Sequence, residues 1–190
     1  MRTFIAISLP QEAKDFLSNI QLQLRSSRAD VKWVEVQNIH LTLKFLGERD
    51  AKQIDKIKII LDEIAQNNKS YAFYLCSIGA FPKKENPSII WIGVSEGNKE
   101  TEKIATEIED KIARIGIPKE KRPFSCHITL GRAKTPKGKE KLIEQISLAE
   151  KNLPTPIPRI QVDKITLFKS TLTSKGPIYE ILHEANLKNS

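Results

Sequence analysis

Two copies of one tetrapeptide carry the residues of this chain that could do chemistry. His40–Leu43 reads HLTL and His127–Leu130 reads HITL, so each places a histidine two residues before a threonine. With 10 threonines and 17 leucines in 190 residues, a given histidine would precede Thr at +2 and Leu at +3 by chance about 0.5% of the time. The repetition marks both tetrapeptides as candidate functional elements.

An imidazole beside a hydroxyl suits proton transfer to and from a phosphoester. The ordinary histidine pKa of about 6.5 lies near physiological pH, so one of two facing histidines can be neutral and the other protonated. The neutral ring could take a proton from an attacking water or hydroxyl, and the protonated ring could give one to a leaving oxygen. The threonine hydroxyls could donate hydrogen bonds to non-bridging phosphate oxygens.

Other interpretations of these residues are structural His–Thr pairs and a zinc site. No carboxylate accompanies the two histidines, which makes a poor zinc ligand set, and strand alternation turns Cys126 away from His127. The third histidine, His183, has no threonine partner, and we expect it to be a structural or surface residue.

Strand geometry explains how the two motifs could present their polar groups. Successive side chains of a strand point to opposite faces, so His40, Thr42 and Lys44 are expected on one face, with their apolar neighbours on the core side. The same alternation puts His127 and Thr129 on one face of the second strand.

The spacing of apolar residues divides the chain into strands and helices. Short apolar or alternating runs predict strands, and apolar residues three and four apart predict helices. Asp50, three residues before Gln53, is typical of a capping box at a helix start. The expected strands cover residues 3–9, 31–36, 39–46, 71–78, 89–94, 123–132, 160–168 and 178–183, and the expected helices carry apolar stripes at 13–24, 54–64, 104–115 and 142–149.

The order of elements starts again after residues 81–87, a polar segment bounded by prolines that we interpret as the connection between two halves. His40 lies 35 residues after Ile5, and His127 lies 37 residues after Ile90. This spacing indicates an internal duplication. Two copies packed about a pseudo-twofold axis would bring equivalent positions to face each other across a cleft.

Length and composition set the domain organisation. A chain of 190 residues that is 39% hydrophobic and 28% charged has the balance of one globular domain. We expect a single bilobed domain over 1–190, with lobes near 1–80 and 88–190 that can intertwine.

Charge and cysteine content limit the partners and the compartment. Lys and Arg total 31 against 23 Asp and Glu, giving a net charge of +8, which favours an anionic partner. Two cysteines, Cys76 and Cys126, are too few for a disulfide scaffold and predict a reducing cytoplasm. No run approaches the ~18 apolar residues of a membrane span, and Pro10 interrupts the first apolar run before it could act as a signal sequence.

The sequence resembles the 2H phosphoesterases and, within them, the RNA 2′,3′-cyclic phosphodiesterases, also called 2′-5′ RNA ligases. The likeness extends over nearly the whole chain. Besides the two tetrapeptides, it is carried by the segments Arg2–Ile7, Trp33–Glu48, Ile90–Gly93, Pro123–Arg132, Leu167–Ser170 and Gly176–Tyr179.

This resemblance implies an α+β fold that is bilobed, with two pseudo-symmetric antiparallel sheets and flanking helices around a central groove lined by His40, Thr42, His127 and Thr129. It implies opening of an RNA 2′,3′-cyclic phosphate to a 2′-phosphate, without metal or cofactor, and a reverse direction that joins a 5′-hydroxyl in a 2′-5′ linkage. His40 would be the proton donor to the 3′ oxygen, and His127 the proton acceptor that activates water. The implied partners are RNAs with cyclic phosphate ends, such as tRNA-like fragments, and the implied state is a monomer.

Further substrate contacts are expected from Lys44, Phe45 and Arg132. Lys44 shares the face of His40 by alternation. The resemblance assigns base stacking to Phe45 and phosphate binding to Arg132, although strict alternation turns both away from the histidines. A bulge at Gly131 would redirect Arg132.

Two other functions remain open from the sequence. A phosphodiesterase of the same superfamily could act on a small nucleotide such as an ADP-ribose cyclic phosphate, and the extent of the basic surface would separate it from an enzyme for RNA ends. A module that binds RNA or nucleotides without chemistry would need phosphate donors but not two groups of opposite protonation state, so the two intact His–Thr pairs argue against it.

Overall fold

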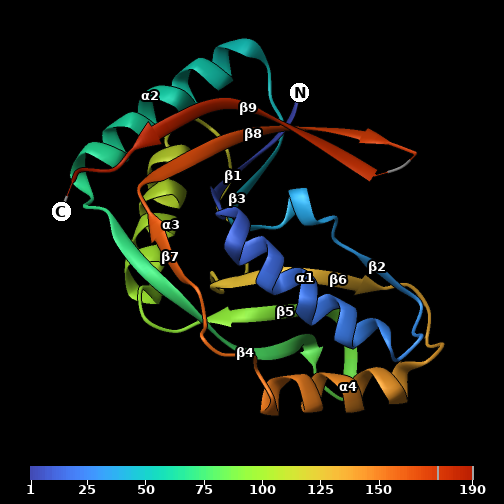
Figure 1. The fold of residues 1–190 in the computed structure, drawn as a ribbon. Helices are drawn as coiled ribbons and strands as arrows, with labels where there is room; N and C mark the ends of the chain where they lie inside the picture. Colours follow the sequence, from blue (N-terminus) through green and yellow to red (C-terminus); the bar gives the residue numbers. More distant parts are fainter. Residues whose placement is uncertain (175, 190) are drawn as a thin grey trace.

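Two antiparallel sheets, each with helices packed on it, make up the molecule, with one sheet above the other in Figure 1. The computed structural model describes residues 1–174 and 176–189. The β1 sheet has the strand order β3-β1-β8-β9, and the β5 sheet has the order β2-β6-β5-β4-β7. The elements are β1 (Arg2–Ser8), α1 (Gln11–Arg25), β2 (Val31–Trp33), the 3₁₀ helix η1 (Val36–Asn38), β3 (His40–Glu48), α2 (Ala51–Asn67), β4 (Tyr71–Lys83), β5 (Asn86–Val94), α3 (Asn98–Ala113), β6 (His127–Ala133), α4 (Lys139–Lys151), β7 (Arg159–Val162), β8 (Lys164–Thr173) and β9 (Gly176–Asn186).

The two sheets repeat one arrangement of strands. In the β1 sheet, β1 pairs with β3 on one side and β8 on the other, and β9 lies outside β8. In the β5 sheet, β5 pairs with β6 and β4, and β7 lies outside β4. Equivalent strands therefore occupy equivalent places, which confirms the expected pair of pseudo-symmetric antiparallel sheets.

Each sheet takes strands from both halves of the chain. β4 closes the first half but pairs with β5 of the second half, while β8 and β9 of the second half complete the β1 sheet. The lobes of the structure therefore differ from the sequence halves 1–80 and 88–190 by an exchange of strands.

Four expected elements differ in the structure. The strand expected at 31–36 ends at Trp33, and the 3₁₀ helix η1 begins at Val36. Residues 81–87, expected as a connection, form a hairpin of β4 and β5 in which Lys83 pairs with Asn86; the prolines that suggested a loop lie beside its turn, where a missing N–H removes little from the ladder. The run 160–168 is two strands in different sheets, because the chain crosses from β7 to β8 at Asp163. The strand expected at 123–132 begins only at residue 127.

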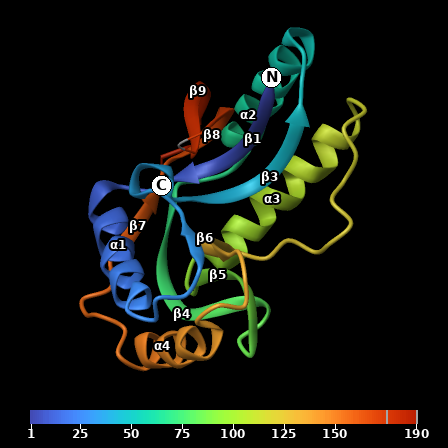
Figure 2. The same ribbon diagram turned by 90° about the vertical axis from the view of Figure 1, so that its right-hand side faces the viewer.

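The helices bury the apolar stripes that the sequence predicts. α2 contacts β8 and β9, and α3 contacts α2 and β3, so both cover the β1 sheet, whereas α1 packs on α4, which covers β4 and β5 (Figure 2). The capping box is confirmed, because Asp50 Oδ1 accepts from the Gln53 backbone at 2.8 Å and Gln53 Oε1 accepts from the Asp50 backbone at 3.3 Å. Within the described residues, no helix is long and apolar enough to cross a membrane. The buried stripe residues include Leu17, Ile20, Ile57, Leu61, Ile104, Ile108, Leu142 and Ile146.

Candidate active site

A groove of about 620 Å³ lies between the two sheets and gathers most of the expected site residues. β3 contributes His40, Thr42 and Phe45 to its lining, and β6 contributes Thr129 and Arg132. The structure therefore brings the two sequence motifs together, and β3 and β6 contact each other.

His127 does not itself line this cavity. It lies on β6 two residues before Thr129, which puts both side chains on the same face of the strand. The charge of Arg132 acts on the pKa of His127, and it also acts on the pKa of Tyr179 in the opposite sheet. Arg132 is thus close to both sides of the groove.

A β-bulge in β3 decides which side chains face the groove. Ile5 and Ala6 of β1 pair with Lys44 and Thr42, so Leu43 has no partner opposite it. An extra residue reverses the alternation for the residues that follow it. Leu43 and Lys44 are both buried, at 4% and 2% exposure.

Because of this bulge, the expected placement of Lys44 is wrong and that of Phe45 on the core face is also wrong. Lys44 points away from the groove, whereas Phe45 is 58% exposed and lines it. The position assigned to Phe45 by family resemblance, rather than by alternation, is the one that the structure adopts.

Strand β6 carries a bulge at the equivalent position. Ile90 and Trp91 of β5 pair with Gly131 and Thr129, which leaves Leu130 without a partner. The bulge turns the exposed residue 132 into the groove. The bulge lies one residue earlier than expected, at Leu130 and not at Gly131.

Gly131 instead allows close contact between strands. A Cβ atom at Gly131 would lie 2.7 Å from a Val31 side-chain atom and 2.9 Å from the Trp33 ring, both on the neighbouring strand β2. A larger residue at this position would push β2 away from β6.

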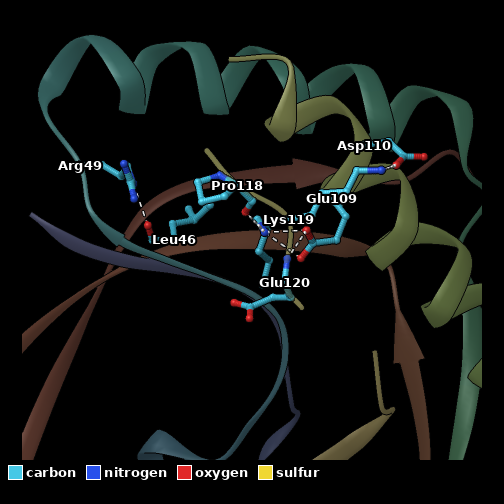
Figure 3. Close-up of polar contacts among 8 residues, drawn as sticks. Leu46, Arg49, Glu109, Asp110, Pro118, Lys119 and Glu120 are labelled. Atoms are coloured by element: carbon cyan, nitrogen blue, oxygen red, sulfur yellow. Dashed lines mark hydrogen bonds and ion pairs between the residues drawn. The ribbon is translucent and has the colours of Figure 1, made fainter. Parts of the chain in front are cut away.

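Lys44 ties β3 to a helix and a loop of the other half of the chain. Its Nζ donates to both carboxylate oxygens of Glu109 on α3, each at 2.7 Å, and to the carbonyl of Pro118 at 3.2 Å. The Glu109 carboxylate also accepts from the backbone N–H of Glu120 at 3.1 Å (Figure 3). This buried ion pair anchors the start of the loop that leads from α3 to β6.

The same backbone contact holds both imidazole rings. His40 Nδ1 lies 2.7 Å from the carbonyl of Asn38, and His127 Nδ1 lies 2.7 Å from the carbonyl of Ser125. A carbonyl only accepts, so Nδ1 carries the proton of each neutral ring and Nε2 presents a lone pair. Nε2 of His40 accepts from Thr42 Oγ1 at 2.9 Å, whereas Nε2 of His127 has no hydrogen-bond partner in the described part of the chain.

Aromatic rings surround both histidines and shield them from water. Burial lowers the pKa of each histidine below its ordinary value, against the raising effect of the backbone hydrogen bond. The charge of Lys14 lowers the pKa of His40 further, and the charge of Arg132 does the same for His127. Both rings are therefore neutral at neutral pH in the free protein. The ring centroids are 4.8 Å apart for His40 and Phe4, 5.5 Å for His40 and Tyr179, 5.1 Å for His127 and Phe81, and 6.3 Å for His127 and Trp91.

Asn38 is a site residue that the sequence reasoning missed. Its carbonyl holds His40, and its side-chain Nδ2 donates to the carbonyl of Pro177 on β9 at 2.8 Å. Asn38 is 8% exposed and lines the groove. It thus connects the ring of His40 to the β8–β9 hairpin, a link between distant segments for which the sequence carries no signal.

Trp91 and Phe81 are further neighbours of His127 that sequence reasoning missed. Phe81 lies in the segment expected to be a loop, and Trp91 belongs to a strand for which only the family resemblance suggested a role. A Cβ atom at Gly79 would lie 2.3 Å from the Trp91 ring, so the glycine on β4 makes room for the indole beside His127. The sequence signal that could have identified Trp91 is its position between two isoleucines.

The remaining histidine and the cysteines have other roles. His183 Nε2 lies 2.7 Å from Asp62 Oδ1 on α2, which confirms its expected structural role. Burial raises the pKa of the Cys126 thiol to about 12, so it is protonated and a poor metal ligand. Among residues 1–174 and 176–189, no three His, Cys, Asp or Glu side chains gather as a ligand set.

Comparison with known proteins agrees with the duplicated sequence. A family model described as LigT like phosphoesterase matches the chain twice, over residues 7–91 and 92–179. The RNA 2′,3′-cyclic phosphodiesterase of Thermotoga maritima is 36% identical over 189 residues, which cover 99% of this chain and 96% of the relative. The protein of the same name from Methanocaldococcus jannaschii is 37% identical over 184 residues, covering 97% of this chain and 99% of the relative. A crystal structure from Thermus thermophilus superposes with a TM-score of 0.79 at 25% identity, and the superposition covers 100% of both chains.

Proposed function

As the chain belongs to the LigT-like phosphoesterase family, we propose that it hydrolyses RNA 2′,3′-cyclic phosphate ends to 2′-phosphates. The observation that carries this proposal is the pair of His–Thr motifs on equivalent strands, in which each imidazole is held by the carbonyl two residues before it. The names of two relatives that are 36% and 37% identical support the same activity. The net charge of +8 suits an RNA substrate.

In the proposed reaction, two proton transfers accompany one displacement at phosphorus. Nε2 of His127 takes a proton from water, and the water oxygen attacks the phosphorus. The bond from phosphorus to the 3′ oxygen breaks, and His40 gives the proton on its Nε2 to that oxygen, which leaves a 2′-phosphate. The lone pair on Nε2 of His127 supports its assignment as the base, because no described residue donates to it. Thr42 and Thr129 line the groove. Protonation of His40 Nε2 releases the Thr42 hydroxyl from that ring, and in the proposed complex both threonine hydroxyls donate to the non-bridging oxygens.

The substrate itself would supply the protonation state that the reaction needs. Burial lowers the pKa of His40, so the free protein holds this ring neutral at neutral pH. An anionic phosphoester in the groove stabilises the imidazolium and raises that pKa. If a 5′-hydroxyl takes the place of water, the same two transfers produce a 2′-5′ linkage.

An assay of the product end tests this function. An oligonucleotide ending in a 2′,3′-cyclic phosphate is incubated with the protein, with and without a metal chelator, and with a 5′-hydroxyl oligonucleotide in a third reaction. We expect a 2′-phosphate product at a rate that the chelator leaves unchanged, and 2′-5′ joined product in the third reaction. A 3′-phosphate product, or loss of activity with the chelator, would contradict the mechanism.

A further inference from the structure

A row of cations lines the groove on the side of the β5 sheet. Lys32 of β2 and Arg132 of β6 are direct cross-strand partners, and Lys134, one residue past the end of β6, lines the groove as well. All three are exposed. In the described part of the chain, none of the three has a carboxylate within ion-pair distance.

Like charges on neighbouring strands destabilise a sheet when no counter-charge is present. Glu35 is the one carboxylate among the described residues that line the groove. The groove therefore carries an excess of positive charge that a ligand with several negative charges would neutralise.

The opposite side of the groove has a different chemistry. It is formed by the β1 sheet and its hairpin, with Phe4, Phe45, Leu172 and Tyr179 in the lining beside a single cation, Arg2, whereas the β5 side has three cations and one aromatic ring, Trp33. Phe45 and Leu172 are 58% and 65% exposed. Exposed aromatic and apolar side chains favour stacking with nucleobases, whereas the cationic side favours phosphates.

The cationic row also extends away from the reacting groups. Along β6, the path from His127 to Ala133, the residue before Lys134, is about 20 Å long at the usual rise of a strand, which exceeds one nucleotide. Lys134 also lines a second cavity of about 180 Å³ at the start of α4, together with Lys137 and Lys139. The positive charge thus continues beyond the groove.

We propose that Lys32 and Lys134, together with Arg132, bind the internucleotide phosphates that precede the cyclic end of an RNA strand. The bases of those nucleotides then lie against the aromatic side of the groove. The substrate class is accordingly an RNA strand of several nucleotides and not a small cyclic nucleotide. This inference rests on the proposed function.

The test compares two substrates that share the same reacting end. One is a nucleoside 2′,3′-cyclic phosphate, and the other is a tetranucleotide that ends in that nucleoside cyclic phosphate. The double variant Lys32→Gln/Lys134→Gln is measured beside the control Lys52→Gln/Lys56→Gln, which removes two exposed lysines of α2 and gives the same change of net charge. Unfolding temperatures verify that both variants are folded.

We expect kcat/KM for the tetranucleotide to fall about tenfold or more in the Lys32/Lys134 variant, while kcat/KM for the mononucleotide falls much less, because it has no internucleotide phosphate to lose. The slope of log KM against log salt for the tetranucleotide should decrease by about 0.7 for each phosphate that the variant no longer binds. The α2 control should match the wild type on both substrates.

Several outcomes would overturn the inference and leave the proposed function standing. These are equal loss on both substrates, no loss on either, or a wild-type protein that cleaves the mononucleotide as efficiently as the tetranucleotide. A wild-type protein that cleaves neither substrate would instead refute the proposed function, and the inference with it.

Discussion

Strands β3 and β6 start alike and then diverge. Each begins with His-x-Thr-Leu, and each has its bulge at the leucine three residues after the histidine. The next two positions differ: Lys44 and Phe45 on β3 correspond to Gly131 and Arg132 on β6. The shared bulge turns Phe45 and Arg132 alike into the groove.

The difference separates proton transfer from substrate orientation. A reaction with one acid and one base needs two similar imidazole groups, which the duplicated strand supplies twice. An RNA strand presents bases and phosphates, which need two dissimilar surfaces, and in the substrate complex that we propose residue 45 would face the bases and residue 132 the phosphates. One backbone feature thus presents the same chemistry twice and different binding groups beside it.

The largest effect should come from removing either histidine. In His40→Ala and His127→Ala, we expect kcat for a cyclic-phosphate oligonucleotide to fall by about 10²–10⁴-fold each. Because the two groups act in one step, the double variant should lose much less than the product of the single losses. Activity retained in one single variant would show that the two motifs are not equivalent. The unfolding temperature provides the control for folding.

Replacing Lys44 should affect stability more than substrate binding. Its side chain is 1% exposed, and removing one partner of a buried ion pair costs about 3–5 kcal/mol. We expect a loss of this order for Lys44→Met in urea unfolding, with partial recovery in Lys44→Met/Glu109→Gln, since no unpaired charge then remains.

A surface pair provides the control for that measurement. The Lys58–Asp55 pair lies at the surface, with a half-buried lysine, an exposed carboxylate and a distance of 3.5 Å, so Lys58→Met should change the free energy of unfolding by less than about 1 kcal/mol. Equal effects of Lys44→Met and Lys58→Met would mean that the link from β3 to α3 contributes little.

Replacing Phe45 and replacing Arg132, the groove residues that follow the two bulges, should alter KM in different ways. Phe45→Ala removes a stacking contact of about 1–3 kcal/mol, so KM should rise without a change in its salt dependence. Arg132→Gln should raise KM and also decrease the slope of log KM against log salt by about 0.7. Identical salt responses of the two variants would contradict the assignment of bases to one side and phosphates to the other.

The smallest expected effects are shifts in the pH profile of kcat/KM. They distinguish the histidine that acts as the acid from the one that acts as the base. Both histidine pKa values are lowered in the free protein, so kcat/KM should be bell-shaped with its maximum below the ordinary value of about 6.5. Arg132 lowers the pKa of His127 and Lys14 lowers that of His40. Arg132→Gln should therefore shift the acidic limb, where the base gains a proton, to higher pH. Lys14→Gln should shift the alkaline limb, where the acid loses its proton, to higher pH.

If the two variants showed the opposite limb shifts, the acid and base assignments of the two histidines would have to be reversed. If Arg132→Gln moved the alkaline limb and Lys14→Gln the acidic limb, His127 would be the acid and His40 the base. A profile without limbs would contradict proton transfer by either ring.

Local patterns in the sequence predicted most of the elements. The capping box at Asp50 and the apolar stripe of α2 involve residues three and four apart, and such short-range geometry follows from the helix itself. The strands around His40 and His127 were likewise predicted, because the motifs alternate. The crossing at Asp163 was not, since Ile160 and Leu167 are fully buried in different sheets and read as one apolar run.

The sequence by itself determined the duplicated His-x-Thr pair and its place on two strands, because these depend on residue type and short-range period, and the family resemblance implied the α+β class. Only the tertiary structure decided the faces of Lys44 and Phe45. A bulge arises from pairing with the next strand, and its effect is invisible to alternation within one strand. The exchange of β4 and β8 between sheets, and the row of Lys32, Arg132 and Lys134, likewise depend on which distant segments become neighbours.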